Sequence, residues 1–239
     1  VEVDGKPIGQ HPLVRKLMSG AFNEKPPQPR YAGTWDVDTV LQYLRSLGPN
    51  SVLSDAQLSH KLAMLLALTQ AARASELQAL NLEFMTDRGR CFEFQIPTLT
   101  KSRKKGSKCS TITVDAFEED PLLDPVTCVR DYIRRTIAWR KSPDFHQLFL
   151  GTIGAHKPVV TSTISGWLLK VMAAAGIDIE EFKAHSTRSA STSKAAAMGL
   201  SVQEIVERGS WTSSSTFYRF YHRVEHKADG FAPKVLSQK

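Results

Sequence analysis

The stretch His185-Ser186-Thr187-Arg188 introduces a run rich in alanine and serine that continues to Met198. This composition predicts a helix, and Ser186 or Thr187 is placed to cap its first turn. His185 and Arg188 then lie three residues apart at a helix start, so both side chains can point at one anion. The helix N-terminus adds a partial positive charge to such a site. The stretch therefore predicts an anion-binding site.

Further helices are predicted on both sides of this stretch, because apolar residues recur at helical spacing. They are expected near residues 36–47, 54–69, 125–140, 161–175 and 202–207, with a last one containing Phe217, Phe220 and Tyr221. Asp36 or Asp38 can cap the first of them. Residues 91–96 and 111–114 alternate apolar with polar side chains, as half-buried strands do. The expected fold class is mainly α with one small antiparallel β-sheet.

Residues 1–30 are interrupted by glycine and proline and end in Lys25-Pro26-Pro27-Gln28-Pro29-Arg30. Proline removes backbone donors and blocks helix, so this segment is predicted to be a linker. Residues 31–239 then form the main domain. The chain begins at Val1 and not at methionine, so we expect it to be a piece of a longer protein.

The composition fits a folded domain with a polyanionic partner. The chain has 239 residues, of which 41% are hydrophobic, and this is long enough for one large domain. Its net charge of +7 favours nucleic acid, although many basic domains bind none. Cys91, Cys109 and Cys128 lack the spacing of zinc knuckles or redox motifs, so we expect a reducing compartment. The sequence shows neither a membrane span nor a secretory leader, so we expect the protein to be nuclear or, if it is not eukaryotic, cytoplasmic.

Arg73 and Glu76 lie three residues apart after the apolar helix predicted near residues 54–69. Alone, an arginine in such a place is more often a partner in a structural ion pair. Its planar guanidinium also matches two phosphate oxygens, and Glu76 on the adjacent turn can hold it in place.

The stretch between the two predicted strands, residues 101–108, carries five positive charges in eight residues. A solvated hairpin tip explains most of them. Like charges in such a run repel one another, however, and a facing phosphate backbone would offset the repulsion. Lys101 is nearest the strand end, where it can reach into a cleft as an acid. DNA contacts are predicted for the other four, Arg103, Lys104, Lys105 and Lys108.

Aromatic residues are frequent near the end of the chain, at Trp211 and in the cluster from Phe217 to His222. Each alone is more often a core residue. Tyrosine is a poor nucleophile at neutral pH because its hydroxyl pKa is about 10. It becomes useful where cations stabilise the developing charge and neighbouring groups manage the protons.

The residues singled out above occur in an order that resembles the active site of the tyrosine recombinase, or phage integrase-like, family: Arg73 with Glu76, Lys101, His185-x-x-Arg188, Trp211 and a tyrosine on the last helix. The resemblance covers about residues 31–225. Three stretches, Pro-Pro-x-Pro-Arg-Tyr, His-Ser-x-Arg-Ser-Ala and Thr-Phe-x-x-Phe-Tyr, further resemble the recombinases of DIRS-type eukaryotic retrotransposons. The resemblance implies a DNA strand transferase that integrates a mobile element in the nucleus.

The family resemblance also implies a role for each residue. Arg73 and Arg188 would clamp the non-bridging oxygens of the scissile phosphate, and His185 would assist in proton transfer. Lys101 would protonate the departing 5′-oxygen. Trp211 stands where many members have histidine, and its indole N–H can still donate one hydrogen bond. No metal or ATP is implied, because protein cations supply the charge and the tyrosyl phosphodiester conserves the bond energy.

The position of the nucleophile departs from much of the family, in which it lies nine residues after the histidine or tryptophan. Here that place is Phe220, whereas Tyr221 lies ten residues and Tyr218 seven residues after Trp211. The DIRS-type pattern favours Tyr221. Tyr218 is the alternative, because it lies on a neighbouring part of the same helical face.

Double-stranded DNA is the implied partner, with self-association on DNA during recombination. The family also has an N-terminal core-binding domain, and residues 1–30 resemble its trailing linker. Three alternatives stay open. They are a type IB topoisomerase with the same tyrosine chemistry, a domesticated DNA-binding protein that has lost the reaction, and a purely structural helical domain.

Overall fold

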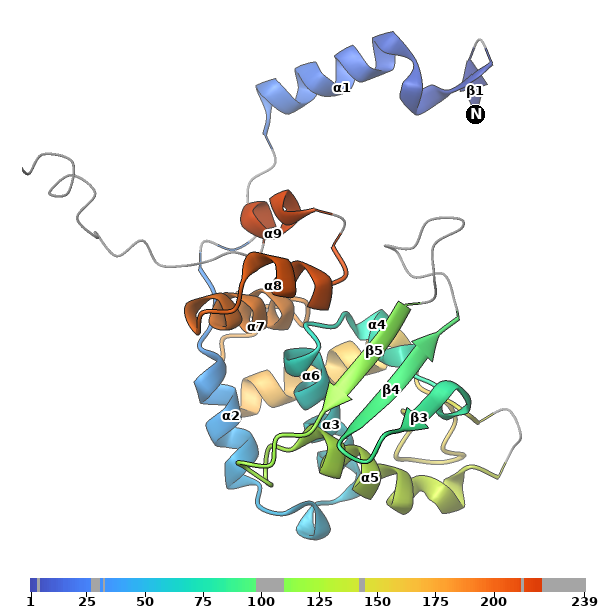
Figure 1. The fold of residues 1–239 in the computed structure, drawn as a ribbon, viewed down its shortest axis with the longest axis vertical. Coiled ribbons are helices and arrows are strands. Elements are labelled where there is room, and N and C mark those ends of the chain that lie inside the picture. The colour runs from blue at the N-terminus through green and yellow to red at the C-terminus, as the bar shows by residue number, and fades with distance from the viewer. Residues whose placement is uncertain are drawn as a thin grey trace, which may run out of the picture. The chain divides into compact units, whose positions relative to one another are not determined.

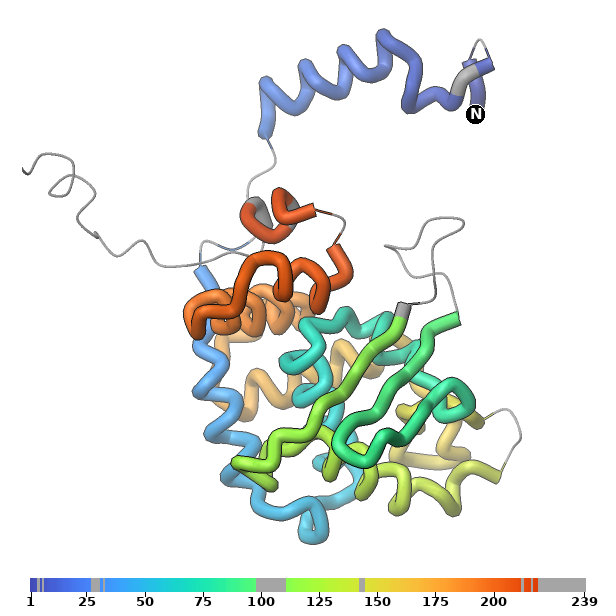
Figure 2. The backbone as a smooth tube through the Cα atoms, in the orientation of Figure 1, coloured from blue at the N-terminus to red at the C-terminus, as the bar shows by residue number. Residues whose placement is uncertain are grey.

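The computed structural model describes residues 1–3, 5–26, 31, 33–97, 110–141, 145–211 and 213–220 (Figure 2). The chain divides into two compact units, Val1–Ala32 and Gly33–Lys239. None of the described helices is both long and apolar enough to cross a bilayer.

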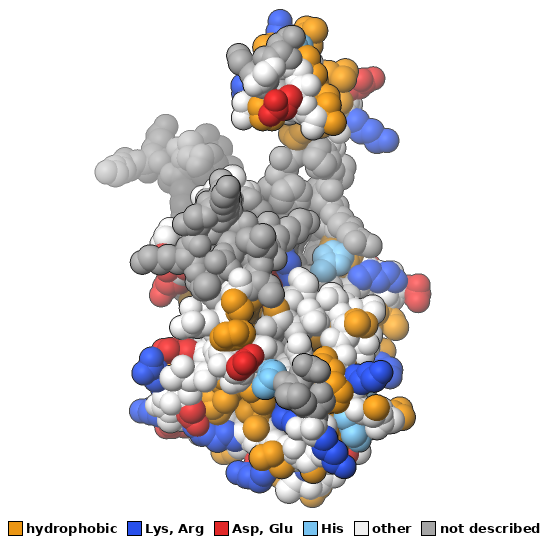
Figure 3. Space-filling model, turned by 90° about the vertical axis from the view of Figure 1, so that its right-hand side faces the viewer, with side chains coloured by type: hydrophobic (Ala, Val, Ile, Leu, Met, Phe, Trp, Pro, Cys, Tyr) orange, Lys and Arg blue, Asp and Glu red, His pale blue; other side chains and the backbone are white. Residues whose placement is uncertain are grey.

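The first unit is small and has few buried side chains. Its elements are β1 (Glu2–Val3), antiparallel to β2 (Lys6–Pro7), then the 3₁₀ helix η1 (Ile8–Gln10) and helix α1 (Pro12–Glu24). The linker prediction missed α1. Pro12 is compatible with this helix because the N–H that proline lacks has no helical partner at the first position. Apolar side chains lie on the surface of this unit, among them Leu13 and Leu17 (Figure 3).

The second unit contains all the helices predicted after residue 35. They are α2 (Val37–Ser46), α3 (Asp55–Thr69), α5 (Pro125–Thr136), α6 (Thr161–Ala174), α7 (Ser186–Ala197), α8 (Val202–Arg208) and α9 (Ser214–Phe220). A short helix, α4 (Ala74–Gln78), and the 3₁₀ helices η2 (Asn50–Val52), η3 (Leu82–Phe84) and η4 (Ile137–Trp139) were not predicted. Asp36 caps α2 as expected, accepting a hydrogen bond from the Asp38 N–H at 2.9 Å. Tyr221 lies outside the described residues.

A three-stranded antiparallel sheet forms one flank of this unit, in the order β3-β4-β5 (Figure 1). The strands are β3 (Met85–Asp87), β4 (Cys91–Ile96) and β5 (Ser110–Asp115). Phe94 pairs with Ile112 in the register of β4 and β5. Alternate residues of β4, Phe92, Phe94 and Ile96, are buried, which is the period that predicted the strand. In this sheet, β3, three residues long, was not predicted.

Helix α3 is the centre of the core and packs against α5, α6 and α7. A capping box fixes its start, in which Ser54 and Gln57 satisfy each other's backbone N–H groups. Its leucines, such as Leu58 and Leu62, are fully buried. Helices α7, α8 and α9 gather at one end of the unit (Figure 1). The predicted fold class, mainly α with a small antiparallel sheet, is confirmed.

Candidate functional site

The turn after α3 places Arg73 at the N-cap of α4. Glu76, in the first turn of α4, holds this arginine twice. Its Oε2 accepts a hydrogen bond from the Arg73 backbone N–H at 2.7 Å, and its Oε1 accepts one from Arg73 Nη1. The expected contact between the two side chains is therefore present. The Arg73 side chain keeps 26% of its surface exposed, so its guanidinium is open to a ligand.

Arg188, in the first turn of α7, is far more enclosed, with 3% of its side chain exposed. Its Nη1 donates to the Ala71 carbonyl at 2.8 Å and lies 3.5 Å from Glu76 Oε2. Its Nη2 donates to the Gly209 carbonyl. Buried charge is costly unless it is paired and hydrogen-bonded, and these contacts meet that condition. Glu76 consequently lies between two arginines.

Trp211 covers one face of Arg188, with the guanidinium carbon 4.4 Å from the ring centroid. A tight turn brings the ring there, since Ser210 has a positive φ of 50°. Gly209 is required at this turn for space. A Cβ atom on it would lie 2.6 Å from the Trp211 ring. The Gly-Ser-Trp motif therefore positions an aromatic wall against the buried arginine.

The expected cap of α7 was wrong. His185 is the N-cap residue, and no side chain caps the helix. Ser186 instead accepts a hydrogen bond from the Trp35 indole N–H at 2.8 Å, and Thr187 donates to the Ala184 carbonyl at 2.8 Å. The helix begins at Ser186, so Ser186 and Thr187 both lie inside its first turn, where neither is the N-cap residue.

A cavity of about 230 Å³ lies between α4, α6 and the start of α7. Its lining includes Arg73, His185 and Arg188, the residues that the sequence predicted would share an anion. A water molecule takes about 30 Å³ of liquid volume, so the cavity has room for a phosphodiester group. Sequence reasoning missed three hydroxyl residues of the lining, Ser75 of α4 and Thr161 and Ser165 of α6. No motif marks them, because only the fold brings α6 beside α4.

Helix α9 packs on the site through Phe217, which is fully buried and whose ring centroid lies 5.8 Å from that of Trp211. Ile205 and Val206 of α8 complete this cluster. Tyr218 is 53% exposed and is not among the residues that line the cavity described above. The structure thus brings together Arg73, Glu76, His185, Arg188 and Trp211. The other predicted site residues lie outside the described residues: Lys101, Arg103, Lys104, Lys105, Lys108 and Tyr221.

The part of the chain that the structure describes holds no cluster of three His, Cys, Asp or Glu side chains that could bind a metal ion. Cys128 is buried, and burial raises the pKa of its thiol to about 12. At neutral pH the thiol of Cys128 therefore stays protonated, and Cys128 serves as a residue of the core.

The family model of the phage integrase family matches residues 36–227, a range that contains every predicted catalytic residue. The chain belongs to this family. No curated protein sequence matches it.

Solved structures of recombinases share the fold. XerH site-specific recombinase in a post-cleavage complex with a palindromic difH substrate is 14% identical, with a TM-score of 0.62. The match covers 87% of this chain and 54% of XerH, so the chain spans about half of that protein. XerA recombinase is 16% identical with a TM-score of 0.60, covering 95% of this chain and 74% of XerA. A lambda integrase tetramer bound to a Holliday junction is 16% identical, with a TM-score of 0.51. The match covers 90% of this chain and 60% of lambda integrase.

Proposed function

We propose that this chain is the catalytic domain of a DNA strand transferase that cleaves and rejoins DNA through a 3′-phosphotyrosyl bond. One observation carries the proposal. Arg73 and Arg188, 115 positions apart in the sequence, flank a single carboxylate, Glu76, and line one cavity together with His185. Their order along the chain is the order of the tyrosine recombinase active site.

The chemistry follows from these groups. A tyrosine oxygen forms a bond to phosphorus, the bond from phosphorus to the 5′-oxygen breaks, and Lys101 gives a proton to that oxygen. His185 assists the transfer of the tyrosine proton. Arg73 and Arg188 stabilise the charge that develops on the phosphate oxygens, the role that a metal ion has in many other phosphoryl transferases. One phosphodiester replaces another, so no ATP is consumed.

Tyr221 is our proposed nucleophile. The DIRS-type pattern of the sequence, in which the tyrosine follows Thr216-Phe217-Tyr218-Arg219-Phe220, supports this choice. Tyr218 is one residue after Phe217 and is largely exposed, which favours it less.

The wider setting is also a proposal. We propose that the protein acts in the nucleus on double-stranded DNA, self-associates there, and integrates a mobile element of the DIRS type. The sequence stretches that resemble DIRS-type recombinases support this. The structures of XerH and lambda integrase, which are bound to DNA, support the DNA partner, and the tetramer of lambda integrase supports self-association.

A suicide DNA substrate tests the proposal. Nicked duplexes of randomised sequence would be incubated with the protein, denatured, and searched for a covalent adduct. We expect an adduct that Tyr221→Phe abolishes and Tyr218→Phe retains. Adduct mapping to Tyr218 would overturn the choice of nucleophile. DNA binding without an adduct would indicate a domesticated binding protein, and relaxation of supercoils without strand exchange would indicate a topoisomerase.

A further inference from the structure

Arg208, the last residue of α8, joins three parts of the second unit. Its Nη1 donates to the Thr113 carbonyl of β5 at 2.9 Å and to Gln70 Oε1, just after α3, at 2.9 Å. Its Nη2 lies 3.3 Å from Asp115 Oδ2 at the end of β5. One guanidinium therefore ties helix α8 to an edge strand and to the end of the central helix.

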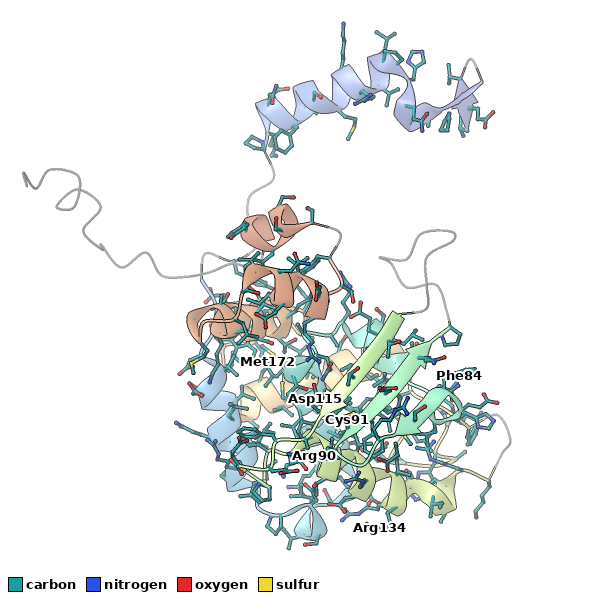
Figure 4. All side chains as sticks on the ribbon, in the orientation of Figure 1. Phe84, Arg90, Cys91, Asp115, Arg134 and Met172 are labelled. Carbon is teal, nitrogen blue, oxygen red and sulfur yellow. The ribbon has the colours of Figure 1, made fainter. Side chains whose placement is uncertain are left out.

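The strand that Arg208 holds leads from the segment of the proposed acid. Residues 97–109 connect β4 to β5, and Lys101 belongs to this connection. Asp115 lies at the opposite end of β5, paired with Cys91 (Figure 4). Arg208 contacts β5 at Thr113 and Asp115, so it fixes the middle and the far end of the strand. Both contacts lie on the strand that follows the connection.

Arg208 also directly precedes Gly209, whose carbonyl accepts a hydrogen bond from Arg188. A second cavity of about 230 Å³ lies between the sheet and α8, and Arg208, Glu76 and Ile96 are among the residues that line it. Glu76 is the carboxylate that holds both site arginines. Arg208 thus links the strand pair to the arginine site. Its side chain contacts β5, and the residue that follows it in the chain, Gly209, contacts Arg188.

We propose that Arg208 is a positioning residue, which holds the β4–β5 pair so that Lys101 reaches the departing 5′-oxygen. The inference rests on the proposed function. A purely structural role makes a different prediction. Arg208 would then only cover the edge of β5, and its loss would lower stability without a preference for any step of the reaction. Its side chain is 43% exposed, and exposed ion pairs stabilise little, so Arg208→Ala is expected to stay folded.

Single-turnover cleavage of two substrates separates these roles. One substrate has the ordinary 5′-oxygen at the scissile bond, and the other has sulfur there, a leaving group that needs no proton. We expect Arg208→Ala to cleave the oxygen substrate about tenfold or more slowly, because a misplaced acid loses most of its effect. It should cleave the sulfur substrate within about threefold of the unmodified protein. Lys101→Ala should show the same pattern more strongly, and the double variant should be no slower than Lys101→Ala alone.

Arg130→Ala is the matched control. Arg130, on α5, also joins a helix to the sheet, through Asp87 at 3.2 Å and the Gly89 carbonyl, but at the turn between β3 and β4. Its loss should leave both rates unchanged. Thermal unfolding of each variant checks the fold. Asp115→Asn, which removes only the ion pair, gives a milder change in the same direction if Arg208→Ala fails to fold.

Two results would overturn the role of Arg208. Normal cleavage of the oxygen substrate by Arg208→Ala would leave it a structural residue. Equal slowing on both substrates would show that Arg208 acts through the arginines that bind the phosphate and not through the acid that protonates the 5′-oxygen. Either result is distinct from failure of the proposed function, in which the unmodified protein forms no adduct and Lys101→Ala shows no difference between substrates.

Discussion

Helices α3 and α7 pack against each other, and both are largely buried, but with opposite chemistry. The buried side chains of α3 are apolar except for Ser59 and Lys61, whereas those of α7 are Ser186, Thr187, Arg188, Ser189, Ala190, Thr192 and Ser193. Burial of the apolar side chains of α3 stabilises the fold, and this effect does not require the side chains to take a particular orientation. Burial of hydroxyls gains less and requires a hydrogen-bond partner for each. The two helices therefore contribute different things.

Three hydroxyls of α7, those of Thr187, Ser191 and Thr192, donate to nearby carbonyls. Thr192 Oγ1 donates to the Arg188 carbonyl at 2.7 Å, and Ser191 Oγ donates to the Leu68 carbonyl at the end of α3. The bond from Ser191 joins α7 to the end of α3, and in the first turn of α7 Arg188 lies 3.5 Å from Glu76 of α4. The comparison teaches that α3 stabilises the unit and α7 gives up apolar packing to hold a buried arginine in place.

The largest expected effect comes from truncating α3. Leu62 is fully buried, so Leu62→Ala should lower the free energy of unfolding by about 2–5 kcal/mol, through lost burial and the cavity left behind. Urea unfolding measures it. Ile153→Ala, at a side chain 89% exposed, is the control and should change stability by less than about 0.5 kcal/mol. The folded fraction of Leu62→Ala should cleave DNA normally. A slower folded fraction would mean that α3 also tunes the site.

The next effect separates charge from geometry in α7. Lysine at position 188 keeps the positive charge but cannot reproduce the planar fork that reaches both Ala71 and Gly209. We expect Arg188→Lys to cut cleavage about 100-fold or more, close to 3 kcal/mol of activation free energy, and to leave DNA affinity within a few fold. Arg45→Lys, at an exposed arginine paired with Asp120, should cleave normally. Normal cleavage by Arg188→Lys would contradict the clamp.

A smaller effect tests the polar packing of α7. Ser186→Ala removes the acceptor of the Trp35 indole N–H in a buried place, so it should cost about 1–2 kcal/mol of unfolding free energy. Trp35→Phe removes the donor. If the hydrogen bond is the cause, the double variant should lose less stability than the sum of the two single variants. Strict additivity in thermal unfolding would show that Ser186 matters only for its volume.

The contrast between α3 and α7 also explains what the sequence could predict. The apolar run around most of the circumference placed α3 to within a residue, as a helix buried in the core. Alternation placed β4 and β5, because burial on one face of a strand leaves its period in the sequence. The order of Arg73, His185 and Arg188 suggested a shared site. A residue type at a motif position carries that information without any knowledge of the fold.

Other features leave no such period. Helix α4 has five residues and β3 has three, too few to show a repeat. The cap of α7 was wrong because Ser186 bonds Trp35, 151 positions away, and a tertiary contact of this kind outweighs local propensity. The contributions of Thr161 and Ser165 to the cavity depend on how α6 packs against α4. Local sequence does not record that packing.

The smallest expected effect concerns a titratable exception in apolar α3. His60 lies against Trp167 of α6, with ring centroids 5.5 Å apart, and burial together with the nearby charge of Lys170 lowers its pKa from 6.5 to about 4. In the unfolded chain His60 takes up a proton near pH 6.5, whereas in the folded chain it does so only near pH 4. Proton uptake therefore favours the unfolded state, and the contribution of His60 to stability should fall as the pH drops from about 6.5 to 4 and then level off.

Unfolding in urea at pH 7.0, 5.5 and 4.5 checks this against His60→Gln, whose side chain stays neutral throughout. We expect the unmodified protein to lose more stability than His60→Gln over this range. The lowered pKa values of Asp87 and Asp120 add their own pH dependence near and below 3.8 in both proteins, so they cancel in the difference. A difference that stays constant from pH 7.0 to 4.5 would show that His60 takes up its proton equally in the folded and unfolded chains, and that the packing of α3 against α6 leaves it open to water.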